Sequence, residues 1–91
     1  MLKIERISDE RGTRICLSGQ LRSEHLSQVK SEVERAAQPV VLDLEEVDLV
    51  DIDGVRFLNK CEAVGIQVLQ CSPYVREWMQ RERNHPKSAP E

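Results

Sequence analysis

Residues 39–44 read Pro-Val-Val-Leu-Asp-Leu, and this short run predicts a central strand of the fold. β-Branched and aliphatic side chains of this kind fit a pleated surface that other elements cover. Residues 23–37 before the run and residues 54–63 after it carry apolar side chains at helical spacing. Because helices and strands alternate around the run, parallel strands joined by right-handed crossovers are expected.

The two ends of the chain complete this prediction. Residues 2–5 and 14–18 alternate apolar and polar side chains on either side of a turn, which predicts an antiparallel hairpin. Residues 66–70 predict a fourth strand, and Ser72 followed by Pro73 predicts the start of a last helix. The predicted fold is α/β, a small mixed four-stranded sheet in the order β-β-α-β-α-β-α. Polar residues at alternate strand positions place the helices mainly on one face.

The chain has 91 residues, of which 40% are hydrophobic and 3% aromatic, so one small domain with an aliphatic core is expected. We expect residues 1–82 to form this domain and residues 83–91 to be a flexible tail, because the tail lacks a hydrophobic pattern. No stretch is apolar enough to cross a membrane, and the first residues do not resemble a signal peptide. A cytoplasmic protein without membrane insertion is therefore expected.

Composition also limits the kinds of partner. Cys16, Cys61 and Cys71 lie in separate segments and form neither a metal-ligand nor a redox motif, so we expect reduced thiols, no metal and no cofactor. The net charge of −3, without basic residues interleaved with aromatics, argues against nucleic acid. Six acids lie within residues 43–53, with no base among them. They suit either contact with a basic protein surface or a simply solvated loop.

Residues 47–54, Val-Asp-Leu-Val-Asp-Ile-Asp-Gly, lead from a predicted strand into a helix, where α/β sheets usually place their sites. An EF-hand loop is excluded, because alignment on Gly54 puts Leu49 and Lys60 where acidic ligands are needed. A phosphoacceptor aspartate of the response-regulator type would lack the acidic pair that holds magnesium. A catalytic carboxylate pair would lack a histidine and a cavity. The chain is therefore predicted not to be an enzyme.

The order of these pieces resembles a STAS domain, the fold of the bacterial anti-sigma factor antagonists. The resemblance covers residues 1–82 and includes Leu-Ser-Gly-Gln-Leu at 17–21, the strand at 39–44, Val-Asp-x-x-Gly at 50–54 and Gly-Ile-Gln-Val-Leu at 65–69. It implies a non-catalytic, cytoplasmic signal-transduction module that binds proteins and regulates transcription. In the antagonist branch the partner is an anti-sigma factor, commonly also a serine kinase-like ATPase that phosphorylates the antagonist.

The resemblance also assigns roles to single residues. The family's phosphoacceptor serine or threonine directly precedes the glycine that opens the second helix, and Asp53 stands there before Gly54. Asp51 matches the motif's aspartate, and Ile52 replaces a second hydroxyl residue. Binding is therefore expected not to be switched by phosphorylation at this loop. Asp53 acts either as a permanent partial mimic of the phosphorylated state or only as a helix cap.

The predicted contact surface spans residues 45–60, the acidic loop and the exposed side of the following helix. The residues expected to bind the partner are Asp51, Ile52, Asp53, Gly54, Arg56, Asn59 and Lys60. The resemblance leaves a second role open, a cytosolic subunit of a lipid-trafficking ABC transporter that docks on its ATPase.

The sequence leaves the roles of two further surfaces undecided. Val75, Trp78 and Met79 form an apolar stripe that predicts packing on the sheet. If Trp78 and Tyr74 were instead exposed, they would suit an interface anchor. The polar sheet face leaves open whether the chain forms a homodimer.

Overall fold

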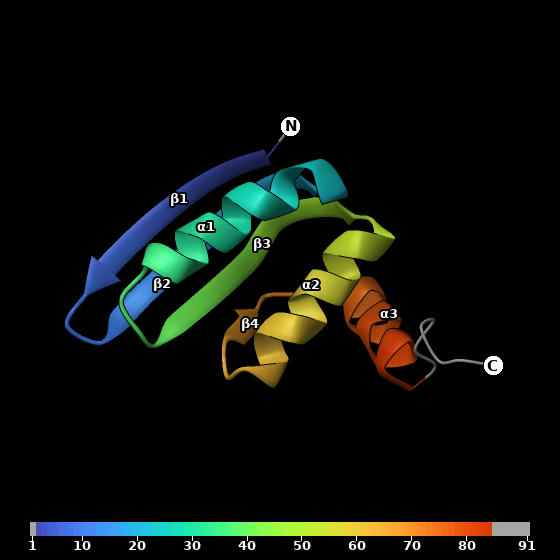
Figure 1. The fold of residues 1–91 in the computed structure, drawn as a ribbon. Helices are drawn as coiled ribbons and strands as arrows, with labels where there is room; N and C mark the ends of the chain where they lie inside the picture. The colour runs from blue at the N-terminus through green and yellow to red at the C-terminus, as the bar shows by residue number, and fades with distance from the viewer. Residues whose placement is uncertain (1, 85–91) are drawn as a thin grey trace.

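The computed structural model describes residues 2–84, which form one sheet covered by helices (Figure 1). The elements are β1 (Leu2–Asp9), β2 (Gly12–Leu21), the 3₁₀ turn η1 (Ser23–His25), α1 (Leu26–Arg35), β3 (Val40–Val50), α2 (Ile52–Ala63), β4 (Gln67–Leu69) and α3 (Pro73–Asn84). The strands lie in the order β1-β2-β3-β4, with β1 antiparallel to β2 and the other neighbours parallel. The predicted α/β fold and its element order are confirmed.

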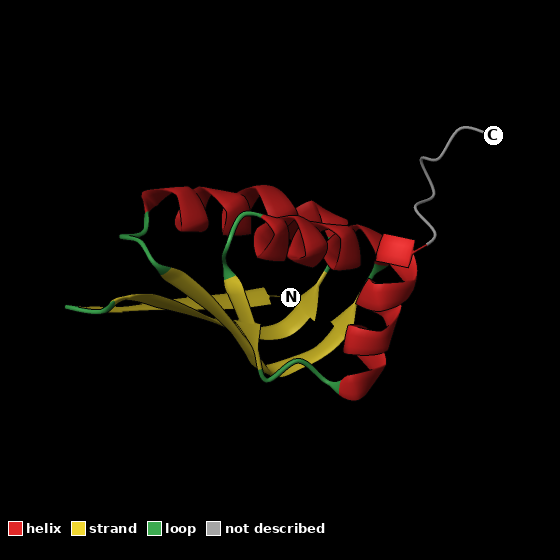
Figure 2. Ribbon diagram, turned by 90° about the horizontal axis from the view of Figure 1, so that it is seen from below, coloured by secondary structure: helices red, strands yellow, loops and turns green. Residues whose placement is uncertain are grey.

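Helices α1 and α2 lie over the same face of the sheet, and α3 packs beside α2 at the end near β4 (Figure 2). The core fills the space between these helices and the sheet. Ile15 and Leu42 from the strands and Val29 and Leu58 from the helices are fully buried there. Burial of such aliphatic side chains is the main source of stability in a chain with few aromatic residues.

The largest difference from the sequence prediction concerns β3. The predicted strand ended at Leu44 and an acidic loop followed, whereas β3 continues to Val50. Its second half pairs with the end of β2 across register shifts near Ser18 and Gly19. Backbone hydrogen bonds to β2 hold this acidic stretch as a strand. Because the register is irregular, its side chains do not show the alternation of apolar and polar residues that predicts a strand.

The starts and ends of the helices follow local signals in most cases. Ser23 was expected to cap the first helix, but it begins η1 and no side chain caps this turn or α1, which starts at Leu26. Ser72 caps α3 as predicted, because its Oγ accepts a hydrogen bond of 3.3 Å from the N–H of Val75. Gly65 has a φ of +96° and ends α2, also as predicted.

The C-terminal helix extends two residues into the segment predicted as a tail, since α3 runs to Asn84. The rest of that predicted tail, residues 85–91, lies outside the described residues. No helix within residues 2–84 is long and apolar enough to span a membrane. Trp78 packs partly against the core, whereas Tyr74 is 70% exposed.

Candidate functional site

The N-terminus of α2 lies where β2 and β3 end, the place predicted for a site. Asp51 is the N-cap of this helix, and its Oδ1 accepts a 2.8 Å hydrogen bond from the N–H of Gly54. Its Oδ2 accepts a 2.9 Å hydrogen bond from the N–H of Ser23. The N–H of Asp51 donates to the carbonyl oxygen of Leu21 at 3.2 Å. One residue therefore ties the start of α2 to both η1 and the end of β2.

Gly54 is required here by close packing. A Cβ on Gly54 would lie 2.7 Å from Cγ1 of Val50 and 2.9 Å from the carbonyl oxygen of Leu21. Val50 is buried and the Leu21 oxygen belongs to the paired backbone, so neither has room to move. The glycine of the Val-Asp-x-x-Gly motif thus lets α2 begin directly against the end of β2.

Asp53 lies in the first turn of α2 and its side chain is exposed. The interpretation of Asp53 as the helix cap is wrong, because Asp51 makes the cap hydrogen bond. The carboxylate of Asp53 still lies near the unpaired N–H groups and the positive end of the helix dipole. A permanent negative charge is therefore presented to solvent at a rigidly held helix start.

The other residues of the predicted contact surface lie in two environments. Lys60 is exposed on α2, whereas Arg56 and Asn59 are partly buried against α3. The Nε of Arg56 donates to Oε1 of Glu82 at 3.2 Å. The Nδ2 of Asn59 donates to the carbonyl oxygen of Met79 at 2.9 Å. Both side chains therefore contribute to holding α3 against α2, a role that the sequence analysis missed.

A charged cluster continues this contact between the two helices. Glu62 of α2 accepts a 2.8 Å hydrogen bond from Nη1 of Arg76 and a further bond from Arg83. Partial burial alone would raise the pKa of the Glu62 carboxyl, but the hydrogen bonds and charges of the two arginines outweigh it. The pKa of Glu62 is therefore lowered from its usual value of 4.5.

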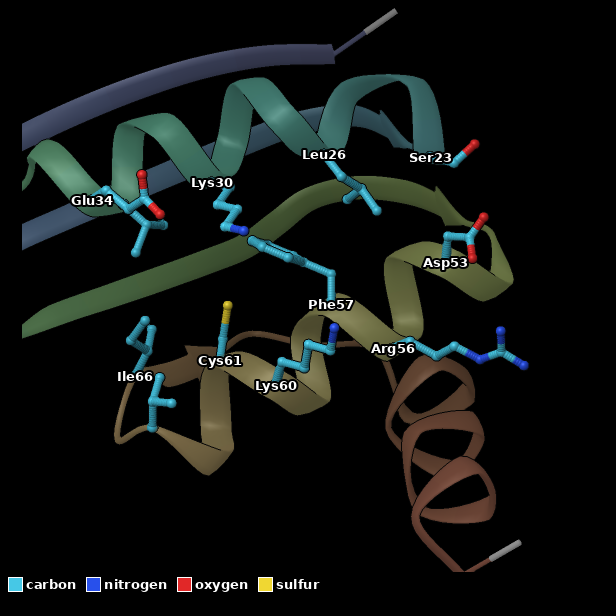
Figure 3. A pocket seen from close by; sticks show the side chains of 12 residues that line it. Ser23, Leu26, Lys30, Glu34, Asp53, Arg56, Phe57, Lys60, Cys61 and Ile66 are labelled. Atoms are coloured by element: carbon cyan, nitrogen blue, oxygen red, sulfur yellow. The ribbon is translucent and has the colours of Figure 1, made fainter. Parts of the chain in front are cut away.

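A groove runs between α1 and α2, and Asp53 lies at one end of it (Figure 3). Its volume is about 600 Å³, and its walls include Leu26 and Phe57. The buried thiol of Cys61 also lines it, and burial raises the pKa of that thiol to about 11. No cavity was expected beside the carboxylates of residues 47–54. This surface groove arises between two helices that are distant in the chain.

Within residues 2–84, no group of three or more His, Cys, Asp or Glu side chains is arranged to hold a metal ion. The three cysteines are free, with Cys61 buried and the other two partly buried.

Similarity to known proteins is found by comparing structures. No family model matches this sequence, and the search of curated proteins found no match to it. The anti-sigma factor antagonist SpoIIAA in its unphosphorylated form matches with a TM-score of 0.63 and 21% identity, covering 88% of this chain and 82% of that one. An antisigma-factor antagonist STAS domain from Rhodobacter sphaeroides matches with a TM-score of 0.59 and 17% identity, covering 80% and 94%. The chain has a STAS-like fold.

The resemblance predicted from sequence is confirmed for the fold. In this STAS-like fold, the helix that follows β3 starts against η1 and the end of β2. The fold therefore brings Ser23, Asp51 and Gly54 together, although the first is distant in sequence from the other two. Asp53 lies on the exposed side of this junction.

Proposed function

We propose that this chain is a regulatory protein-binding module that acts as an anti-sigma factor antagonist and has no catalytic activity. The fold it shares with two antagonists supports this proposal. The observation that carries it is the placement of Asp53, an exposed charge beside a glycine that packing requires. Asp51 performs the capping, so Asp53 is left to contact a partner.

The proposed partner-binding surface is the start of α2 and the two helical turns that follow it. It consists of Asp51, Ile52, Asp53, Gly54, Arg56, Asn59 and Lys60. Asp53 and Lys60 are exposed and contact the partner directly in this proposal. Asp51 and Gly54 hold the shape of the surface, and Arg56 and Asn59 fix α3 beside it.

The proposed partner is an anti-sigma factor of the serine kinase-like ATPase type in a bacterial cytoplasm. A phosphate would carry a charge of about −1.5 to −2, whereas a carboxylate carries about −1. Asp53 therefore holds the surface permanently in a state that partly mimics phosphorylation, and in this proposal that state binds the partner weakly. Binding at this surface is not switched by phosphorylation of residues 47–54, which contain no hydroxyl side chain.

A pull-down from lysate of the source organism, read by mass spectrometry, tests this function with three baits. The baits are the wild type, Asp53→Ser and the control Glu10→Ser. Glu10 is exposed in the β1–β2 turn, at the opposite end of the sheet from the start of α2 (Figure 1), and its substitution removes the same charge. We expect the Asp53→Ser bait to recover a kinase-like anti-sigma factor at least tenfold better than the other two.

Two other results would contradict the proposal. Equal recovery of an anti-sigma factor by all three baits would show that Asp53 does not control binding. Equal recovery of a transporter ATPase by all three would instead favour the role of a cytosolic transporter subunit.

A further inference from the structure

The groove between α1 and α2 is a second candidate site, which shares Asp53, Arg56 and Lys60 with the proposed partner-binding surface. Leu26 and Val33 line it from α1, and Phe57 and Cys61 line it from α2. Figure 3 shows these helices as two facing walls, with Ile66 near the end away from Asp53. The lining is mostly apolar, although the groove is open to solvent. Its volume of about 600 Å³ lies within the range of small-molecule sites.

Charged side chains are arranged along this groove in a definite order. Lys30 from α1 and Lys60 from α2 lie in its middle part, on opposite walls, while Asp53 and Glu34 lie toward its two ends (Figure 3). Both lysines are exposed, and the ion pairs found among residues 2–84 use neither of them. Arg56 also lines the groove at the end near Asp53, where its guanidinium is paired with Glu82 (Figure 3). An anion is therefore favoured between the two unpaired lysines and disfavoured beside Glu34.

We propose that this groove binds an anionic amphiphile with a single alkyl chain, such as a fatty acid. The carboxylate lies between Lys30 and Lys60, where it accepts hydrogen bonds from both amines. The alkyl chain lies along Val33, Cys61 and Ile66, and its burial supplies most of the affinity. Apolar walls with a few charged groups that fix orientation are typical of such sites.

Isothermal titration calorimetry on the purified chain tests the ligand class, with all ligands below their micelle concentrations. We expect dodecanoate to bind at least tenfold more tightly than dodecyltrimethylammonium, which has the same chain and the opposite charge. Decanoate, which lacks two methylenes, is expected to bind about tenfold more weakly than dodecanoate. Amide shifts in a ¹H–¹⁵N spectrum are expected at Leu26, Val33 and Phe57.

A pair of charge variants tests the role of the lysines. Lys30→Gln combined with Lys60→Gln is expected to weaken dodecanoate binding at least tenfold and to abolish the preference for the anion. Lys3→Gln combined with Arg11→Gln removes the same charge from exposed positions on β1 and its turn. This control is expected to bind dodecanoate within twofold of the wild type.

A second pair tests the apolar wall without disturbing the core. Val64 is 75% exposed and lines the groove, whereas the adjacent Ala63 is exposed and does not line it. Val64→Asp is expected to weaken dodecanoate binding at least tenfold, and Ala63→Asp less than threefold. Because both positions are exposed, circular dichroism is expected to show both variants folded.

Three results would overturn the proposal. They are equal binding of the anionic and cationic amphiphiles, amide shifts confined to the polar sheet face, and no saturable binding of dodecanoate. If instead a purified protein partner shifted the groove residues and dodecanoate did not bind, the groove would be a protein interface. These tests use the isolated chain, so their failure is independent of the pull-down result.

Discussion

The N-terminus of α2 and the rest of the helix are attached to the molecule by different kinds of interaction. At its N-terminus, backbone hydrogen bonds, the carboxylate of Asp51 and the close approach at Gly54 join it to β2 and η1. Along its length, side-chain ion pairs join it to α3, among them Arg56–Glu82 and Glu62–Arg76. The first attachment depends on shape, so it tolerates little change in volume. The second depends on charge, so it responds to pH.

Substitution of Gly54 tests the attachment by shape and should have the largest effect. We expect Gly54→Ala to lower the free energy of unfolding by about 2 kcal/mol or more, because the new methyl group would overlap Val50 and the Leu21 carbonyl. Without this overlap, alanine would stabilise the helix by about 1 kcal/mol relative to glycine. The sign of the change in unfolding free energy therefore shows whether the overlap is present. Urea unfolding followed by circular dichroism measures it.

Gly65 provides the matched control for this substitution. A Cβ there would meet nothing within 4 Å, but its φ is +96°. We therefore expect Gly65→Ala to cost about 1 kcal/mol, from backbone strain alone. A smaller cost for Gly54→Ala than for Gly65→Ala would contradict the close approach of α2 to β2.

Substitution of Asp51 separates the cap from the exposed charge. Asp51→Ala removes the acceptor of the Gly54 and Ser23 N–H groups and is expected to cost about 1–2 kcal/mol of unfolding free energy. Asp53→Ala removes only a favourable charge near the helix dipole, and its expected cost is below about 0.5 kcal/mol. Thermal and urea unfolding of both variants measure this difference. Equal costs would mean that Asp53 shares the capping role.

Acid titration of Glu62 tests the attachment by charge and should have the smallest effect. The pKa of Glu62 is lowered in the folded chain, so its contribution is fully present above the unfolded value of 4.5 and is lost as the pH falls through the folded value. We expect Glu62→Gln to cost about 1 kcal/mol at pH 7. The cost is expected to shrink as the pH is lowered below about 4.5.

Urea unfolding of the wild type and Glu62→Gln at pH 7 and pH 3 measures this change. Glu77→Gln is the matched control, since Glu77 forms an exposed pair with Arg81 within α3. Its expected cost is below about 0.5 kcal/mol at either pH. An unchanged cost of Glu62→Gln between the two pH values would show that the helix contact does not depend on this carboxylate.

Most features that near neighbours in the chain decide were predicted correctly, the cap at Ser23 being the exception. Ser72 followed by Pro73 marked the start of α3, and Gly65 marked the end of α2. The apolar run at 39–44 correctly indicated a central strand. Each of these features is decided by the conformational preferences of a few adjacent residues, which the sequence displays directly.

Features that depend on distant neighbours were missed or assigned to the wrong residue. The acidic second half of β3 is a strand only because the end of β2 pairs with it. The hydrogen bond from the N–H of Ser23 to Asp51 was missed because the two residues are 28 positions apart in the chain, and the motif alone did not distinguish Asp51 from Asp53 as the cap. The groove was missed because its walls come from α1 and α2, which β3 separates in the sequence.

The sequence by itself determined the element order, the mixed sheet and the position of the acidic residue before Gly54. Hydrophobic periodicity and turn residues carry that information locally. Only the tertiary structure decided which distant residue Asp51 joins to the start of α2, which side chains hold α3, and where a groove opens beside Lys30 and Lys60. The physical reason is that hydrogen bonds, ion pairs and grooves depend on distances between residues that are far apart in the chain.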